Sequence, residues 1–280
     1  MILSPRYDGP TILTTDATSA APRSQELPCA RQRRRLEGVL GELTAEQWAS
    51  PSRCEGWSVR DVVVHLTSVN AFWALSARQG VAGTPTRFLG AFDPAATPSQ
   101  MVAGVATTDP VDVLADFVRS NDGFLGTIAA FGDDEWAALA ESPIGHVSIG
   151  LMVQHALWDS WIHERDILLP LGLSQVEEPD EIESCLVYAA AVSPALGIGF
   201  GLECAPLLAV DATGPAVGFT VSVGAAVEVR AAAAAGAPCL TGGAVEVAEA
   251  LSLRAPMPAG APPEWTRLRD GLATAFDAPT

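Results

Sequence analysis

The chain has 280 residues and a formal net charge of −17 at pH 7, because 16 arginines and no lysine oppose 33 acidic residues. Such a negative charge repels phosphate backbones and anionic lipid headgroups, which argues against nucleic acid or a membrane surface as the main partner. Five scattered cysteines without a CxxC pair favour a reducing compartment over a disulfide framework or a zinc ribbon. With no signal-peptide pattern and no long apolar run, the sequence predicts a soluble cytoplasmic protein.

The first part of the chain is predicted to be a tail followed by a helix. Residues 1–28 are rich in Pro, Thr, Ser and Ala, show no periodicity and predict a mobile tail. From Arg31 to about Trp48, apolar residues keep helical spacing. The basic run RQRRR at 31–35 fits either an anion site or a solvated helix start, and the surrounding negative charge favours the solvated start.

Four further helices are predicted before residue 200. Ser58 and Asp61 have the spacing of a capping box at the start of the second helix, and Asp109 with Pro110 opens the third. A fourth helix ends at Pro170. The predicted spans are 58–78, 109–128, about 147–169, and 177 to the residue before Pro194.

Beyond residue 204 the sequence changes to short β-branched segments separated by Gly and Pro. PLLAVDATG, AVGFTVSVG and AAVEVRAA predict strands, whereas GGAVEVAEAL and PPEWTRLRDGLATAF predict helices. The sequence therefore predicts a two-domain α+β protein, with a helical bundle over 29–200 and a small α+β domain over 204–280.

The histidines indicate a candidate metal site. His155, Asp159 and His163 are four residues apart, so they share one stripe of the fourth helix. Two ligands four residues apart on one helix can converge on one ion, and His65, on the buried face of the second helix, could supply a third. Nitrogen and oxygen donors of this kind suit zinc, and also nickel, iron or manganese. The alternative is a buried histidine that only hydrogen-bonds a helix carboxylate.

Neighbouring residues have two interpretations each. His155 lies two turns from His163, which favours an outer or substrate-facing role over coordination. Asp166 could accept the free imidazole N–H of His163 or pair with Arg165 at the surface. Asp61, one turn before His65, has the same two interpretations, and His146 is expected at the surface.

Two motifs resemble a known family. SPSRCEGWSVRDVVVHL is similar to the first signature of the mycothiol-dependent maleylpyruvate isomerase family, relatives of the DinB-like metalloproteins, and WDSWIHERDILLPLG is similar to its second. The resemblance spans about residues 30–275 and is specific in the two motifs. It implies a DinB-like four-helix bundle followed by a small sterol-carrier-like α+β domain, in a protein of actinobacterial type.

The resemblance also implies a cofactor and its ligands. In that family a divalent metal, usually zinc, is held by the histidine of the first motif and by the acidic residue and histidine of the second, which are His65, Asp159 and His163 here. The family has glutamate where Asp159 stands, and aspartate is one methylene shorter. The second cofactor is mycothiol, whose addition to an alkene and later elimination isomerises the double bond. An arginine of the C-terminal domain helps to hold the anionic substrate, and Arg230 and Arg254 are the candidates; the alternative for either is a structural arginine at a strand edge.

Three functions remain open from the sequence. The first is a metal- and thiol-dependent isomerase or transferase acting on a small electrophile such as a maleylpyruvate-like unsaturated acid, with His155 and the two arginines as candidate catalytic residues. The second is a family member used in specialised-metabolite biosynthesis without mycothiol. The third is a non-catalytic module that binds a small molecule. Tryptophans beside the two motifs belong to the core or line an apolar substrate pocket.

Overall fold

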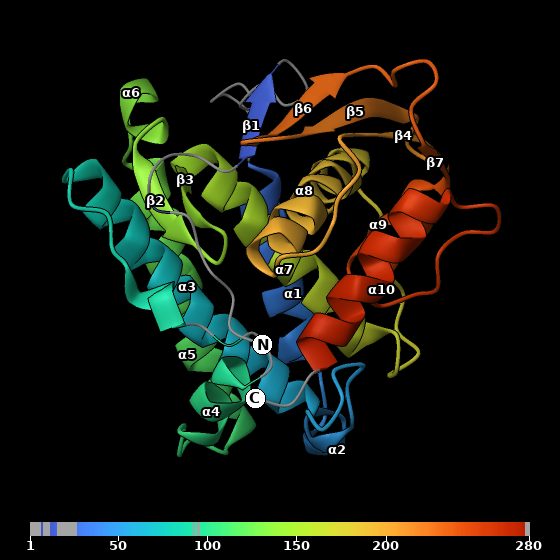
Figure 1. Ribbon diagram of the computed structural model, residues 1–280. Coiled ribbons are helices and arrows are strands. Elements are labelled where there is room, and N and C mark those ends of the chain that lie inside the picture. The colour runs from blue at the N-terminus through green and yellow to red at the C-terminus, as the bar shows by residue number, and fades with distance from the viewer. Residues whose placement is uncertain (1–6, 8–11, 16–26, 92, 94–95, 278–280) are drawn as a thin grey trace.

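The computed structural model describes residues 7, 12–15, 27–91, 93 and 96–277 of the chain. It has an α+β fold in which a helical N-terminal part precedes a sheet, as the sequence predicts (Figure 1). The helices before the sheet are α1 (Pro28–Gly41), α2 (Ala45–Ala49), α3 (Val59–Val81), the 3-10 helix η1 (Phe88–Ala91), α4 (Thr97–Ala103), α5 (Pro110–Ala129), α6 (Asp133–Trp136), α7 (Ile149–Leu168) and α8 (Pro179–Gly199).

Helices α1, α3, α5 and α7 pack against one another as the bundle. Ser58 caps α3, and Asp61 accepts the backbone N–H of Ser58 in return, so the predicted capping box forms. Asp109 caps α5 with Pro110 in its first turn, as predicted. The first predicted helix, however, is two helices, because Thr44 forms a second capping box with Gln47 and starts α2.

The basic run at the start of α1 is not a solvated helix face, and that prediction is wrong. Gln32 and Arg33 are buried, and Arg35 is largely buried between α7 and α8. Arg33 donates to the side-chain oxygen of Asn70 and to the carbonyl of Ala156. The periodicity of leucines did not reveal this, because the partners come from other helices of the bundle.

The sheet has five strands in the order β1-β6-β5-β4-β7. Strands β4, β5 and β6 are antiparallel, while the outer strands β1 and β7 run parallel to β6 and β4. Helices α8, α9 (Ala244–Leu251) and α10 (Pro263–Asp277) cover one face of this sheet (Figure 1). The strands are β1 (Ile12–Thr15), β4 (Leu207–Thr213), β5 (Val217–Val223), β6 (Val227–Ala231) and β7 (Cys239–Gly243), and a separate hairpin consists of β2 (Leu139–Ser142) and β3 (Gly145–Ser148).

Strand β1 lies within the segment predicted as a mobile tail. It pairs with β6 through its backbone, and Ile12 is buried. Farther towards the N-terminus, the Tyr7 hydroxyl donates to Glu141 of β2. A four-residue strand shows no sequence period, so its pairing was not visible in the sequence. Most of the remaining tail residues lie outside the described part of the chain.

Helix α8 connects the bundle to the sheet. It packs against α7, α9 and the inner strands, and one apolar core runs from Trp161 through Tyr188 to Phe219. The helix continues past Pro194, where the sequence predicted its end, because it is buried on most sides. It is the one helix among the described residues that is long and apolar enough to span a bilayer, but 72% of that window is buried, as in a core helix. The division of the chain near residue 200 stays a prediction.

Candidate metal site

Helices α3 and α7 bring three candidate ligands together inside the bundle. Nε2 of His65 lies 3.9 Å from one carboxylate oxygen of Asp159, and Nε2 of His163 lies 3.7 Å from the other. The two imidazole centres are 5.0 Å apart. The i to i+4 spacing fixes Asp159 and His163 on one face of α7, and the packing of α3 against α7 supplies His65.

This donor set fits a divalent transition metal. Two nitrogens and one carboxylate oxygen, all within 4.8 Å of one another, match the three protein ligands of many catalytic zinc sites. Ligand atoms of one tetrahedral zinc are about 3.3 Å apart, so the side chains would have to move closer together to bind an ion. Three protein ligands would leave a coordination position for water, thiol or substrate.

Asp166 contacts the ring nitrogen of His163 that is not directed at Asp159. Its buried carboxylate lies 3.0 Å from Nδ1 of His163 and accepts two 3.0 Å contacts from Nε of Arg254. It also accepts from the Cys54 thiol at 3.2 Å. Because Asp166 engages Nδ1, Nε2 of His163 faces Asp159, which is the orientation a ligand needs. The sequence allowed two partners for Asp166, and the structure shows that its partner is the imidazole of His163.

The charges at the site are set by burial and by these contacts. Burial by itself would raise the pKa of Asp159, but the neighbouring imidazole of His65 and the charge of His163 lower it below its usual range. Burial would also lower the pKa of His163, whereas the hydrogen bonds to Asp166 and Cys54 and the charge of Asp159 raise it to about 10. Without metal, His163 is therefore a cation between two carboxylates, and metal binding must displace its proton.

A pH dependence follows for the metal-free protein. The pKa of His163 is raised from 6.5 to about 10, so the stability it contributes is fully present below pH 6.5 and is lost as the pH rises towards 10. We expect the free energy of unfolding in urea of chelator-treated protein to fall over that range. His163→Gln should flatten the profile, and equal slopes in both proteins would contradict this assignment.

Removing the charge of Asp166 should weaken metal binding without deleting a candidate ligand. We expect Asp166→Asn to lower zinc affinity by about 10-fold to 100-fold, because Nδ1 of His163 loses its carboxylate partner. Competition with a chromophoric chelator would measure the change. Asp61→Asn is the control, since Asp61 serves the α3 cap and the Arg60 ion pair rather than His65. An affinity of Asp166→Asn equal to that of wild type would contradict the orienting role.

The two arginine candidates differ in position. Arg254, after α9, reaches Asp166 and lies 3.6 Å from Sγ of Cys54. Arg230 does not join the site, because the alternation of β6 buries Val227 and Val229 and turns Arg230 outwards. Its side chain is 64% exposed and pairs with Glu228.

The other histidines have separate roles. His155 is buried one turn before Asp159, and burial lowers its pKa to about 4, with Asp159 opposing and His65 adding to the effect. The sequence predicted His146 at the surface, and that prediction is wrong. His146 is buried in β3, where its Nε2 lies 2.8 Å from the carbonyl oxygen of Thr86. A four-residue strand such as β3 is too short to show an alternation of apolar residues, so the sequence did not predict that His146 is buried.

Cys54 and Arg53 were not identified from the sequence as residues of the site, and Arg165, which the sequence placed at the surface as a possible partner of Asp166, is buried. Cys54 lies within the first motif, yet only the structure puts its sulfur 3.6 Å from Nδ1 of His163. Arg53 binds Glu249 of α9 at 2.8 Å and lies 3.4 Å from Asp166. Arg165 also binds Glu249, at 2.8 Å. These ion pairs connect the α7 side of the site to the C-terminal part, across sequence separations that no local pattern reveals.

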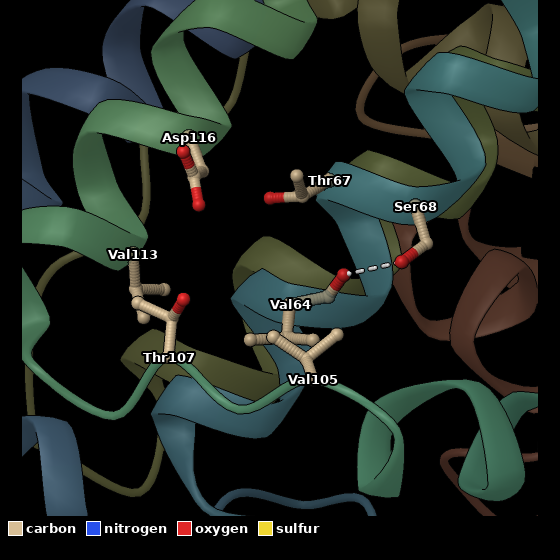
Figure 2. A pocket seen from close by; sticks show the side chains of 7 residues that line it. All are labelled: Val64, Thr67, Ser68, Val105, Thr107, Val113 and Asp116. Carbon is tan, nitrogen blue, oxygen red and sulfur yellow. Dashed lines mark hydrogen bonds between the residues drawn. The ribbon is translucent and has the colours of Figure 1, made fainter.

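A groove on another face of α3 is distinct from this site. It has a volume of about 250 Å³ and lies between α3, α5 and the segment after α4 (Figure 2). Its lining is mainly valine and threonine, with Asp116 as its charged residue. None of the three candidate ligands lines it.

The fold and the donor cluster define a class: a helical bundle with a candidate metal site, followed by a small mixed sheet. Residues 29–168, half of the 280-residue chain, match the family described as Mycothiol maleylpyruvate isomerase N-terminal domain, and the chain belongs to that family. The resemblance noted in the sequence is thus confirmed.

Individual relatives are distant. Two uncharacterised Mycobacterium tuberculosis proteins, from two strains, are 25% identical over 140 residues, which is 49% of this chain and 52% of theirs. The match thus spans about half the length of these relatives. The crystal structure of the mycothiol-dependent maleylpyruvate isomerase aligns with a TM-score of 0.60 at 14% identity, over 86% of this chain and 96% of that one. A histidine-to-alanine mutant of it gives 0.61 over the same shares. At this identity the likeness shows the fold.

Proposed function

We propose that the protein is a metal-dependent enzyme that acts on a small electrophilic unsaturated acid such as maleylpyruvate. It would use mycothiol either to isomerise this acid or to transfer the thiol to it. The observation that carries the proposal is the convergence of His65, Asp159 and His163 in a chain of this family. Zinc is the proposed metal, because two imidazoles and one carboxylate with an open position are its usual catalytic ligand set. A small acidic protein with free cysteines suits a cytoplasmic enzyme of small-molecule metabolism.

The metal, when bound, would lower the pKa of a coordinated thiol so that it reacts as a thiolate near neutral pH. The chain's own residues would then position the partners. Asp166 would keep Nε2 of His163 directed at the ion. Arg254, whose guanidinium already lies beside a carboxylate at 3.0 Å, would bind a substrate carboxylate at the rim of the site.

Turnover by zinc-loaded protein tests the proposal. With mycothiol and maleylpyruvate, wild-type protein should form the trans isomer at a rate proportional to enzyme concentration, followed by proton NMR. His163→Gln should lose this activity, and omission of mycothiol should abolish it. No turnover by fully zinc-loaded wild type would overturn the choice of maleylpyruvate as substrate. Turnover without mycothiol would instead support the second function, a family member that acts without the thiol.

A further inference from the structure

His155 lies in an aromatic enclosure beside the candidate metal site. Its ring centre is 4.9 Å from Trp73 of α3, 5.4 Å from Trp158 of α7 and 5.2 Å from Tyr188 of α8. Trp158 is fixed from the other side, because its Nε1 donates to Ser252 at 2.8 Å. His155 also shares the α7 stripe with Asp159, one turn away.

A short hydrogen bond joins His155 to Tyr188. Nδ1 of His155 lies 2.5 Å from the Tyr188 hydroxyl oxygen, and both residues are buried. The enclosure keeps the imidazole neutral at pH 7, since burial lowers the pKa of His155 to about 4. Burial also holds the pKa of Tyr188 well above its usual value, with the charge of Asp159 adding to the effect, so the hydroxyl keeps its proton.

The direction of the hydrogen bond between Tyr188 and His155 determines which ring nitrogen of His155 carries the proton. Among the described residues the Tyr188 hydroxyl has no other hydrogen-bond partner. If Nδ1–H donated to it, the hydroxyl proton would be buried without an acceptor, at a cost of about 1–3 kcal/mol, whereas Nε2 of His155 is not among the fully buried polar atoms without a partner, so a proton there can be hydrated. The hydroxyl therefore donates to Nδ1, and the imidazole proton resides on Nε2.

Two donors of the enclosure then remain unused by the described residues. Nε2–H of His155 has no partner there, and its residue is 7% exposed rather than sealed. Nε1 of Trp73 is buried and also without a partner. Unpaired donors in an aromatic wall beside a metal site suit a flat ligand that carries an oxygen acceptor.

We propose that Tyr188 is a positioning residue that locks His155 as the neutral Nε2–H tautomer, so that His155 donates a hydrogen bond to the carbonyl oxygen of a planar, unsaturated ligand bound beside the metal. This inference rests on the proposed function and adds to it the residue that would bind the carbonyl oxygen of its unsaturated substrate and the residue that positions it. When a thiolate adds to an alkene conjugated to that carbonyl group, its electron pair forms the C–S bond, the alkene π pair moves into the bond between the α-carbon and the carbonyl carbon, and the carbonyl π pair moves onto oxygen to give an enolate. The Nε2–H bond would stabilise that oxygen, and elimination of the thiolate returns the electrons.

Imidazole nitrogen NMR tests the lock without any substrate. In zinc-loaded, ¹⁵N-labelled protein, two-bond correlation spectra should show His155 with a protonated Nε2 and an unprotonated Nδ1. The chain has only four histidines, so His155→Gln assigns the signal. Tyr188→Phe should shift His155 towards a mixture of tautomers. Tyr7→Phe, the other tyrosine of the chain, should leave its spectrum unchanged, because Tyr7 contacts Glu141 and His146 instead.

Kinetics test the donation to substrate. Tyr188→Phe should lower kcat for maleylpyruvate by roughly 100-fold with KM little changed. His155→Gln, whose amide can donate from a similar place, should retain more activity than His155→Phe. A protonated Nδ1 in wild type, or an unaltered His155 spectrum in Tyr188→Phe, would overturn the lock; an altered spectrum with unchanged kcat would overturn the donation. If wild type does not turn over maleylpyruvate, that choice of substrate is overturned, and donation to its carbonyl oxygen with it, while the spectra still decide the lock.

Discussion

Replacing His163 with alanine is expected to leave the purified protein with less than about a tenth of an equivalent of divalent metal, whereas wild type retains close to one. The substitution removes an imidazole that lies 3.7 Å from the Asp159 carboxylate and leaves two candidate donors on different helices. Losing a direct ligand should cost more than the roughly 10-fold to 100-fold that losing an outer partner costs. Elemental analysis after chelator-free purification measures the content.

His146→Ala is the matched control for this loss. His146 is also a buried histidine, but it contacts the Thr86 carbonyl and lies outside the donor cluster, so its removal should leave metal content unchanged. Equal metal content in His163→Ala and wild type, with both proteins folded by circular dichroism, would refute the ligand assignment. A loss of metal in both variants would indicate general destabilisation instead.

Residue 159 is aspartate where the family has the longer glutamate, and this difference provides a second test of the same site. The oxygens of Asp159 stand 3.7 Å and 3.9 Å from the two imidazole nitrogens. Because glutamate extends one methylene farther, we expect Asp159→Glu to bind zinc at least as tightly as wild type, and Asp159→Asn to bind it more weakly. Tighter binding by the asparagine variant would contradict a role for the negative charge.

The candidate site was accessible from the sequence because its main spacing is local. An α-helix puts residues i, i+4 and i+8 on one face wherever it packs, so the stripe of His155, Asp159 and His163 required only that 149–168 be helical. The contacts of Cys54 with His163 and of Arg53 with Asp166 depend on how the loop before α3 lies against α7, and the contact of Arg254 with Asp166 depends on where the segment after α9 lies. Sequence periodicity carries no information about such docking.

The same distinction explains the differences in the fold. The long helices and the strands β4 to β6 carry caps or alternating apolar residues, and the sequence predicted them. Strands β1, β2 and β3 have four residues, too few to establish a period, and the five residues of β7, CLTGG, lack the alternation that VEVRA shows in β6. Helix α8 continues through Pro194 because burial between α7 and the sheet outweighs the local cost of proline.

The largest stability effect is expected at Arg35. Its guanidinium binds Glu164 at 2.9 Å and Glu181 at 2.7 Å, and both carboxylates are almost completely buried. Arg35→Met should lower the free energy of unfolding by about 3–5 kcal/mol, because Glu164 is left buried without its cation, while Glu181 keeps Arg31 at 2.9 Å. Urea denaturation, analysed with a common m-value, measures the loss.

Arg34→Met provides the matched comparison on the same helix. Its side chain is 45% exposed and pairs with Glu37 and Asp122, so we expect a loss of about 0–1 kcal/mol. Adding Glu164→Gln to Arg35→Met removes the uncompensated charge, and the double variant should be less destabilised than the sum of the single variants. If the losses at Arg34 and Arg35 were equal, or if the two changes were simply additive, the cost at Arg35 would come from lost packing. The buried ion cluster would then contribute little to holding α1 against α7 and α8.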